Sequence, residues 1–136
     1  MLGQYAPQVA VNAELQGRFV TTNGSGTPGT IVPFVFAVPD AATSDIDIVV
    51  NDKIEVIDVI CRKDGGAGAG NTMQIKKGSA AISDAIACAV DKTITRAGTI
   101  DVANNQLNPL DTLRLTATKA AGTRTATVTV LAVIRP

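Results

Sequence analysis

The sequence lacks histidine and tryptophan altogether, and its aromatic residues are one tyrosine and three phenylalanines. Without histidine, Ser-His-Asp and Cys-His catalysis are excluded, and so is every metal site that needs an imidazole ligand. Net charge is lacking too, because 12 basic residues balance 12 acidic ones. A neutral chain with few rings to stack on bases does not fit a general nucleic-acid binder.

Long hydrophobic runs are missing as well. The longest apolar stretch, residues 31–38, is interrupted by Pro33, whereas about 20 apolar residues are needed to cross a bilayer. The first residues lack the basic and apolar regions of a signal peptide. We therefore expect a protein that works in a cytoplasm, or in a particle assembled there, with no membrane partner and no nucleic-acid partner.

Cysteine is scarce, with Cys61 and Cys88 as the two examples. No Cys-x-x-Cys pair and no histidine can complete a zinc site. We expect two small, buried apolar residues. A disulfide is the alternative, and a reactive thiol comes third because no histidine is available to generate the thiolate.

The sequence is rich in β-strand patterning from Ile31 onward. Apolar side chains recur at every second position in residues 31–38, 45–50, 72–77, 113–118 and 125–134, which is typical of half-buried strands. Pro33 cannot donate to a strand ladder, so 31–38 is predicted to be an edge strand, or a strand interrupted there. At the C-terminal end, 113–118 and 125–134 are predicted to form a hairpin.

Residues 54–62 differ from these stretches because they are apolar on both faces. One face holds Ile54, Val56 and Ile60, and the other holds Ile57, Val59 and Cys61. Such a strand is expected to lie centrally between two layers, or to be covered by another subunit.

Residues 79–90 are the one helical candidate. Ile82, Ile86 and Val90 recur every four residues among alanines, and Ser79 is a suitable N-cap. One or two helical turns fit this spacing best, and a pair of short strands is the alternative.

The chain is predicted to be all-β. Residues 31–136 are expected to form an antiparallel, jelly-roll-like sandwich that includes one short helix. Its 136 residues are enough to bury a core without metals or disulfides. Residues 1–30 are predicted to form an extended N-terminal arm that ends in a glycine-rich loop. The apolar side chains of the arm must pack on the main body, on a neighbouring subunit or on another protein, and the predicted contact residues are Leu2, Tyr5, Val9, Val11, Leu15 and Phe19.

Four groups of side chains invite a chemical interpretation. Asp45 and Asp47 alternate on one strand face and could serve acid–base catalysis, but a solvated face explains them better. The glycine run 65–70 lacks the Gly-Lys ending of a phosphate-binding loop, and Lys76 with Ser79 stands in a turn-like context. Possible calcium ligands lack EF-hand spacing; they are Asp40, Asp45, Asp47, Asn51 and Asp52. We expect no catalytic residue, metal site or cofactor, and a protein that is not an enzyme.

Charge is unevenly distributed along the chain. Residues 40–58 hold six acidic residues and one basic residue, a net charge of −5, whereas residues 62–136 hold ten basic and five acidic residues, a net charge of +5. Either an acidic patch of one copy binds a basic patch of another, or the two segments intermix on the folded surface and cancel.

Several short motifs stand in the second half of the chain. They are the glycine-rich run before Asn71-Thr-Met-Gln-Ile75, then Ile82-Ser-Asp-Ala-Ile86, Arg96-Ala-Gly-Thr-Ile-Asp101, Leu113-Arg-Leu-Thr116 and Val128-Thr-Val-Leu-Ala-Val133. Through them, residues 31–136 resemble the small β-rich head-decoration (cement) proteins of tailed bacteriophages. The resemblance implies a virion protein, assembled in the host cytoplasm, that forms a homotrimer on the outer capsid surface and bridges major capsid proteins without catalysis or a cofactor. Members often attach through an N-terminal arm, a use that residues 1–30 fit.

A carbohydrate- or receptor-binding β-sandwich module of a phage spike or fibre is the alternative. Sugar sites usually need exposed aromatic platforms, and the sequence offers Tyr5 and Phe19, because Phe34 and Phe36 are predicted to be buried. An enzyme is the third hypothesis, and it would have to depend on carboxylates or a lysine alone.

Overall fold

The computed structural model describes residues 26–39, 45–64, 71–88, 92–118 and 125–136. These residues are all-β, and they contain no helix. The strands are β1 (Ile31–Val38), β2 (Asp45–Val49), β3 (Ile54–Lys63), β4 (Thr72–Lys77), β5 (Ala80–Ala81), β6 (Ile86–Ala87), β7 (Ile94–Arg96), β8 (Gln106–Leu107), β9 (Thr112–Thr118) and β10 (Ala126–Ile134). Within the described residues, no helix has the length and hydrophobicity needed to cross a membrane.

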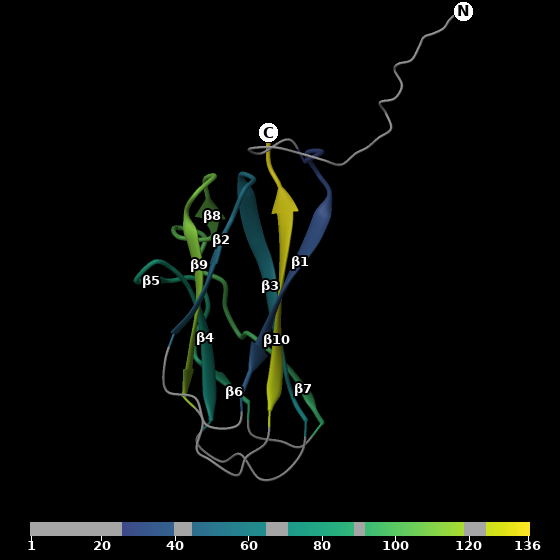
Figure 1. The fold of residues 1–136 in the computed structure, drawn as a ribbon, viewed down its shortest axis with the longest axis vertical. Coiled ribbons are helices and arrows are strands. Elements are labelled where there is room, and N and C mark those ends of the chain that lie inside the picture. The colour runs from purple at the N-terminus through teal and green to yellow at the C-terminus, as the bar shows by residue number, and fades with distance from the viewer. Residues whose placement is uncertain (1–25, 40–44, 65–70, 89–91, 119–124) are drawn as a thin grey trace, which may run out of the picture.

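The strands form two antiparallel sheets that lie in two layers (Figure 1). The first sheet has the order β1-β10-β3-β7, with β8 also paired to β3. The second sheet has the order β2-β9-β4-β5, with β6 also paired to β4. The first four long strands therefore alternate between the layers, and β1, β3 and β10 lie in the first sheet while β2, β4 and β9 lie in the second.

The predicted C-terminal hairpin is wrong, although both of its strands exist. β9 pairs with β2 and β4, whereas β10 pairs with β1 and β3. Period-two patterning shows which residues of a strand face the core, but it does not distinguish two strands that pair from two that enter opposite sheets.

The core lies between the two sheets. Alternate residues of the long strands point inward from both layers and form one buried cluster, as the apolar periodicity predicts. From the second sheet it includes Met73, Ile75, Leu113 and Leu115, and from the first Phe36, Ile54, Val59, Val128 and Val130.

β1 is an edge strand, as Pro33 predicts. The Ile134 amide donates to the Thr30 carbonyl at 2.9 Å, so alternate residues from Val32 onward hydrogen-bond with β10. Pro33 belongs to the other set, whose backbone groups face the free edge. Its missing amide proton therefore costs the ladder nothing.

A β-bulge in β3 corrects the prediction of a strand with two apolar faces. Leu131 of β10 pairs with Asp58 while its neighbour Ala132 pairs with Val56, so Ile57 has no partner across the ladder. The extra residue changes which positions point inward. Before the bulge the buried residues are Ile54 and Val56; after it they are Val59, Cys61 and Lys63. The inward side of the strand is therefore covered by the second sheet of the same chain, whereas Ile57 and Ile60 lie on its outer side.

The helix predicted over residues 79–90 is not found in the described part of that segment, and the alternative of two short strands is right. β5 pairs with Lys76 and Lys77 at one end of β4, and β6 pairs with Thr72 and Met73 at the other. Between them, the Ser83 hydroxyl accepts from the Ile75 amide at 3.0 Å. The segment from β5 to β6 contains two more residues than a regular strand paired with β4 would need. Ile82 and Ile86 therefore both lie in the core although they are four residues apart.

The expectation of two free cysteines is also wrong, because Cys61 and Cys88 form a disulfide with a Cα–Cα distance of 6.1 Å. Cys61 lies in β3 of the first sheet, and Cys88 directly follows β6 of the second. Both residues are buried. The disulfide therefore connects the two layers through the core.

The predicted arm falls largely outside the described residues, and so do its predicted contact residues. Residues 26–30, however, contact the main body. The Gly26 amide donates to Asp52 Oδ1 at 3.0 Å, and the Gly29 amide donates to the Ile134 carbonyl at 2.7 Å. The chain thus enters β1 from a fixed point beside the end of β10.

Candidate functional site

The outer face of the first sheet carries apolar residues on three neighbouring strands, β1, β10 and β3, although Thr127 and Thr129 of β10 and three charged residues of β3 also point outward. We call this surface the apolar face; its residues are Ile31, Pro33, Val35, Ile57, Ile60, Leu131 and Val133. Ile31, Val35 and Ile57 are 55%, 58% and 43% exposed. Contiguous exposed apolar surface of this kind marks an interaction site far more often than scattered single residues do.

The strand register brings these side chains together. Ile31 lies opposite Val133 and Pro33 opposite Leu131. The bulge adds Ile57 beside them, because it leaves that side chain without a ladder partner on the outer surface. Residues far apart in the sequence thus share one surface, in which Thr129 lies between Val35 and Ile60.

Ion pairs border the apolar face along β3. Asp58 pairs with Arg96 of β7, and Glu55 Oε1 lies 3.3 Å from Arg135 Nη1. Each of these exposed charges has a partner of opposite sign in the same chain. The border therefore has no excess charge that would direct a strongly charged partner to this surface.

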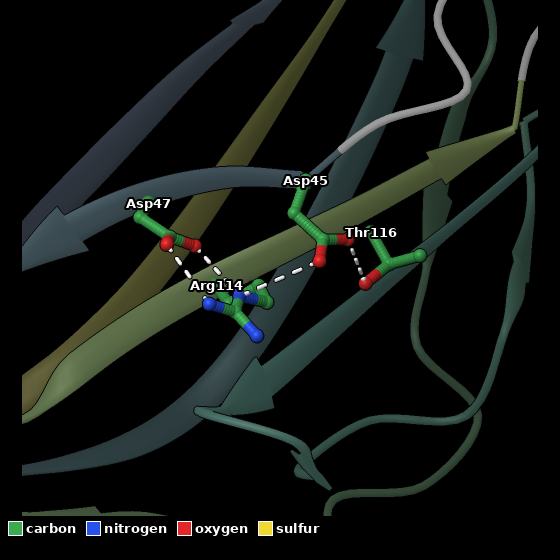
Figure 2. Close-up of polar contacts among 4 residues, drawn as sticks. All are labelled: Asp45, Asp47, Arg114 and Thr116. Carbon is green, nitrogen blue, oxygen red and sulfur yellow. Dashed lines mark hydrogen bonds and ion pairs between the residues drawn. The ribbon is translucent and has the colours of Figure 1, made fainter.

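The outer face of the second sheet is polar, and Figure 2 shows its main cluster. The Arg114 guanidinium donates two hydrogen bonds to the Asp47 carboxylate, from Nε at 2.8 Å and from Nη2 at 3.0 Å. The same Nε lies 3.6 Å from Asp45 Oδ2, and the Thr116 hydroxyl donates to Asp45 Oδ1 at 2.8 Å. The β2–β9 register creates the cluster, since Asp47 lies opposite Arg114 and Asp45 opposite Thr116.

This geometry supports the interpretation of Asp45 and Asp47 as a solvated strand face. The hydrogen bonds from Arg114 hold the pKa of Asp47 below its ordinary value, because they stabilise the charged form. A general acid at neutral pH needs the opposite shift. The Asp47 carboxylate is therefore suited to an ion pair across two strands and not to donating a proton.

The other sequence candidates are dispersed. Among the proposed calcium ligands, Asp52 accepts the Gly26 amide and Asp40 lies outside the described residues. In the part of the chain that the structure describes, no three acidic or cysteine side chains are grouped to hold a metal ion. The glycine run 65–70 also lies outside the described residues. Lys76 is in β4, and Ser79 is in the turn before β5.

The acidic and basic segments of the chain intermix on the folded surface. Arg96, Arg114 and Arg135 come from the basic segment, and each of them pairs with a carboxylate of residues 40–58. Of the two alternatives for the charge distribution, the described residues thus favour cancellation within one copy over patches that join two copies.

The apolar face was not among the predicted site residues, although the sequence carries part of its signal. In residues 31–38 the positions opposite the core-facing set are Ile31, Pro33, Val35 and Ala37, which are all apolar. A strand with a solvated outer side would place polar residues there. The contribution of Ile57 could not be predicted, because it depends on the bulge.

Comparison of the chain with protein-family models, with curated proteins and with solved structures finds no match. A proposal about function therefore has to be argued from the residues and the geometry described above.

Proposed function

We propose that the protein is a structural virion protein that trimerises on the outer surface of a tailed-phage capsid and stabilises the head by bridging major capsid proteins. The observation that carries this proposal is the apolar face on β1, β10 and β3. It adds to the resemblance of residues 31–136 to decoration proteins. The proposal includes a jelly-roll-like sandwich as the finer description of the two sheets.

The energetics of the apolar face favour a permanent partner. Burial of apolar surface contributes about 25 cal/mol per Å², and the exposed side chains of Ile31, Val35 and Ile57 lose this contribution in an isolated copy. A neighbouring copy or a capsid protein that covers them gains it. The polar outer face of the second sheet is then the surface that stays in water.

The disulfide is consistent with a location on the virion surface. Disulfides persist in oxidising surroundings and are rare in a reducing cytoplasm. A capsid-surface protein meets oxidising surroundings once the particle has left its host. The bond between Cys61 and Cys88 fits such a protein, because it stabilises a fold that must persist outside the cell.

Light scattering of the full chain tests the proposal. We expect a solution mass near three times the 13.9 kDa of one chain. A mass of one chain across the whole accessible concentration range would contradict a trimer. Reproducible hits on a glycan array would instead favour the alternative, a carbohydrate-binding module.

A further inference from the structure

We propose that residues 1–11 of one copy lie on the apolar face of a neighbouring copy, so that the copies are joined by exchanged N-terminal segments. The inference rests on the proposed function, since it names the segment that holds the trimer together. It commits to one occupant for the apolar face, and the size of the face, the composition of the segment and the position of Gly26 support it.

The size of the apolar face fits one extended segment better than the body of another copy. On β1 the apolar face runs from Ile31 to Val35, so it is about 15 Å long, and its three strands make it about 14 Å wide. The resulting area of about 200 Å² is well below the roughly 800 Å² per partner of a standard interface. Eleven extended residues reach about 36 Å, more than enough to cross the face.

The composition of the segment matches the face. Residues 1–11 contain no charged side chain, and they carry Leu2, Tyr5, Val9 and Val11. The centre of the apolar face is also uncharged, and the carboxylates beside it are already paired with arginines. Neither surface would leave an unpaired charge buried in the complex, which is the main penalty for covering a sheet face.

The position of Gly26, the first described residue, favours a neighbouring copy. Gly26 lies on the core side of the first sheet, since a Cβ at this residue would stand 2.5 Å from Cδ1 of the buried Ile134. To reach its own apolar face, the segment would have to turn around the end of β10. Residues 12–25 can span up to about 46 Å, far enough to reach the apolar face of an adjoining copy.

Tyr5 provides a direct probe, because it is the one tyrosine of a chain without tryptophan. Its fluorescence, with acrylamide as the quencher, reports whether residue 5 is covered in the full-length protein. We expect Tyr5 of the wild type to be shielded from the quencher in a particle with the mass of three chains. Shielding and mass are measured on the same sample.

Two valines of nearly equal exposure give a matched pair of variants. Val35 of β1 is 58% exposed on the apolar face, and Val49 of β2 is 56% exposed on the outer side of the other sheet, each on an edge strand. We expect Val35→Lys to increase the quenching of Tyr5 severalfold and to reduce the mass to that of one chain. Val49→Lys should leave both unchanged. Val35→Thr keeps the shape and strand preference of valine and should give a smaller change in the same direction, with circular dichroism confirming that each variant is folded.

Three results would overturn the inference, and they are distinguishable from failure of the proposed function. A trimer in which Tyr5 is freely quenched would mean that the body of another copy covers the face; the proposed function would survive. A monomer in which Tyr5 is shielded and Val35→Lys exposes it would mean that the segment covers its own copy, and the trimer would be wrong as well. Equal effects of Val35→Lys and Val49→Lys would show that the apolar face has no special role.

Discussion

The two outer faces of this protein differ although the sheets behind them bury the same kind of core. On the first sheet, the residues of β1 that point away from the core are all apolar, and Leu131, Val133, Ile57 and Ile60 extend this surface onto β10 and β3, beside threonines and ion-paired charges. On the second sheet the corresponding positions carry the Asp45–Asp47–Arg114–Thr116 cluster (Figure 2). A folded domain needs one buried face per sheet, so the second apolar face of the first sheet is not required for the fold of one copy.

Val35 and Val49 show that the surroundings of an exposed residue, and not its exposure, carry the information. Both valines lie opposite a threonine, Val49 opposite Thr112 and Val35 opposite Thr129. The outward neighbour of Val49 along β2 is the charged Asp47, and a single exposed valine there needs no explanation. Val35 shares its surface with Ile31, Pro33 and Ile57, and a contiguous group of exposed apolar residues does need an explanation. We therefore interpret the apolar face as an interaction surface and the other face as a solvated one.

The largest expected effect concerns the bulge that gives β3 its share of the apolar face. Deletion of Ile60 should abolish folding, because a one-residue shift turns Cys61 and Lys63 from the core to the outer side and separates Cys61 from Cys88. Deletion of Ile57 should be tolerated, with the free energy of unfolding lowered by about 1–2 kcal/mol at most, since Asp58 would then follow Val56 in regular alternation.

Denaturant unfolding and a thiol assay on the two deletion variants test this prediction. We expect no free thiols in the Ile57 deletion, and two in the Ile60 deletion. Loss of folding in both variants would show that the bulge itself is essential, and our account of it as an inserted outward-facing residue would be wrong.

The second expected effect concerns the connection between the layers. The double variant Cys61→Ser, Cys88→Ser should lower the free energy of unfolding by about 3–4 kcal/mol, since the lost bond closes a separation of 27 residues. Denaturant titration of the variant and the wild type measures the difference. The wild type should also resist reductant until it unfolds, because both cysteines are buried. Rapid reduction under native conditions would contradict this burial.

The smallest expected effect concerns the polar face. Arg114 lowers the pKa of Asp47 in the folded protein, so this carboxylate contributes stability above its unfolded pKa, and the contribution is lost as the pH falls through the lower folded pKa. The wild type should thus be slightly more stable than Asp47→Asn at neutral pH, and the difference should vanish in acid.

NMR titration should show the pKa of Asp47 rising in Arg114→Gln. An unchanged titration would mean that the ion pair does not form in solution.

Much of the strand pattern could be predicted because alternation depends on local sequence. The inward-facing residues of 45–50, 72–77 and 125–134 lie where period two places them. The prediction of a helix over residues 79–90 is wrong because an alanine-rich sequence with isoleucines four residues apart is compatible with a helix as well as with two short strands that pair with β4. The chain itself gave no local signal that Ser83 would replace a ladder partner of Ile75.

The candidate site was predictable only in part. The apolar outer side of residues 31–38 is readable from the sequence, yet it acquires meaning only when β10 and β3 place Leu131, Val133 and Ile57 beside it. The predicted contact residues of the arm lie outside the described residues, so they remain predictions. The net charges of the acidic segment (40–58) and of the basic segment (62–136), by contrast, could be counted from the sequence. Which carboxylate pairs with which arginine depends on the strand register.

Composition and alternation by themselves determined that this chain forms β-strands with one inward face and that β1 lies at an edge, because a missing amide proton and a period of two are local properties. Tertiary structure decided the rest. It placed 113–118 and 125–134 in opposite sheets, and it brought Cys61 to Cys88. It also left Ile57 without a ladder partner, which changes the residues of the second half of β3 that face the core. Each of these is a choice of partner between segments distant in the chain, and partners are selected by the packing of the whole core.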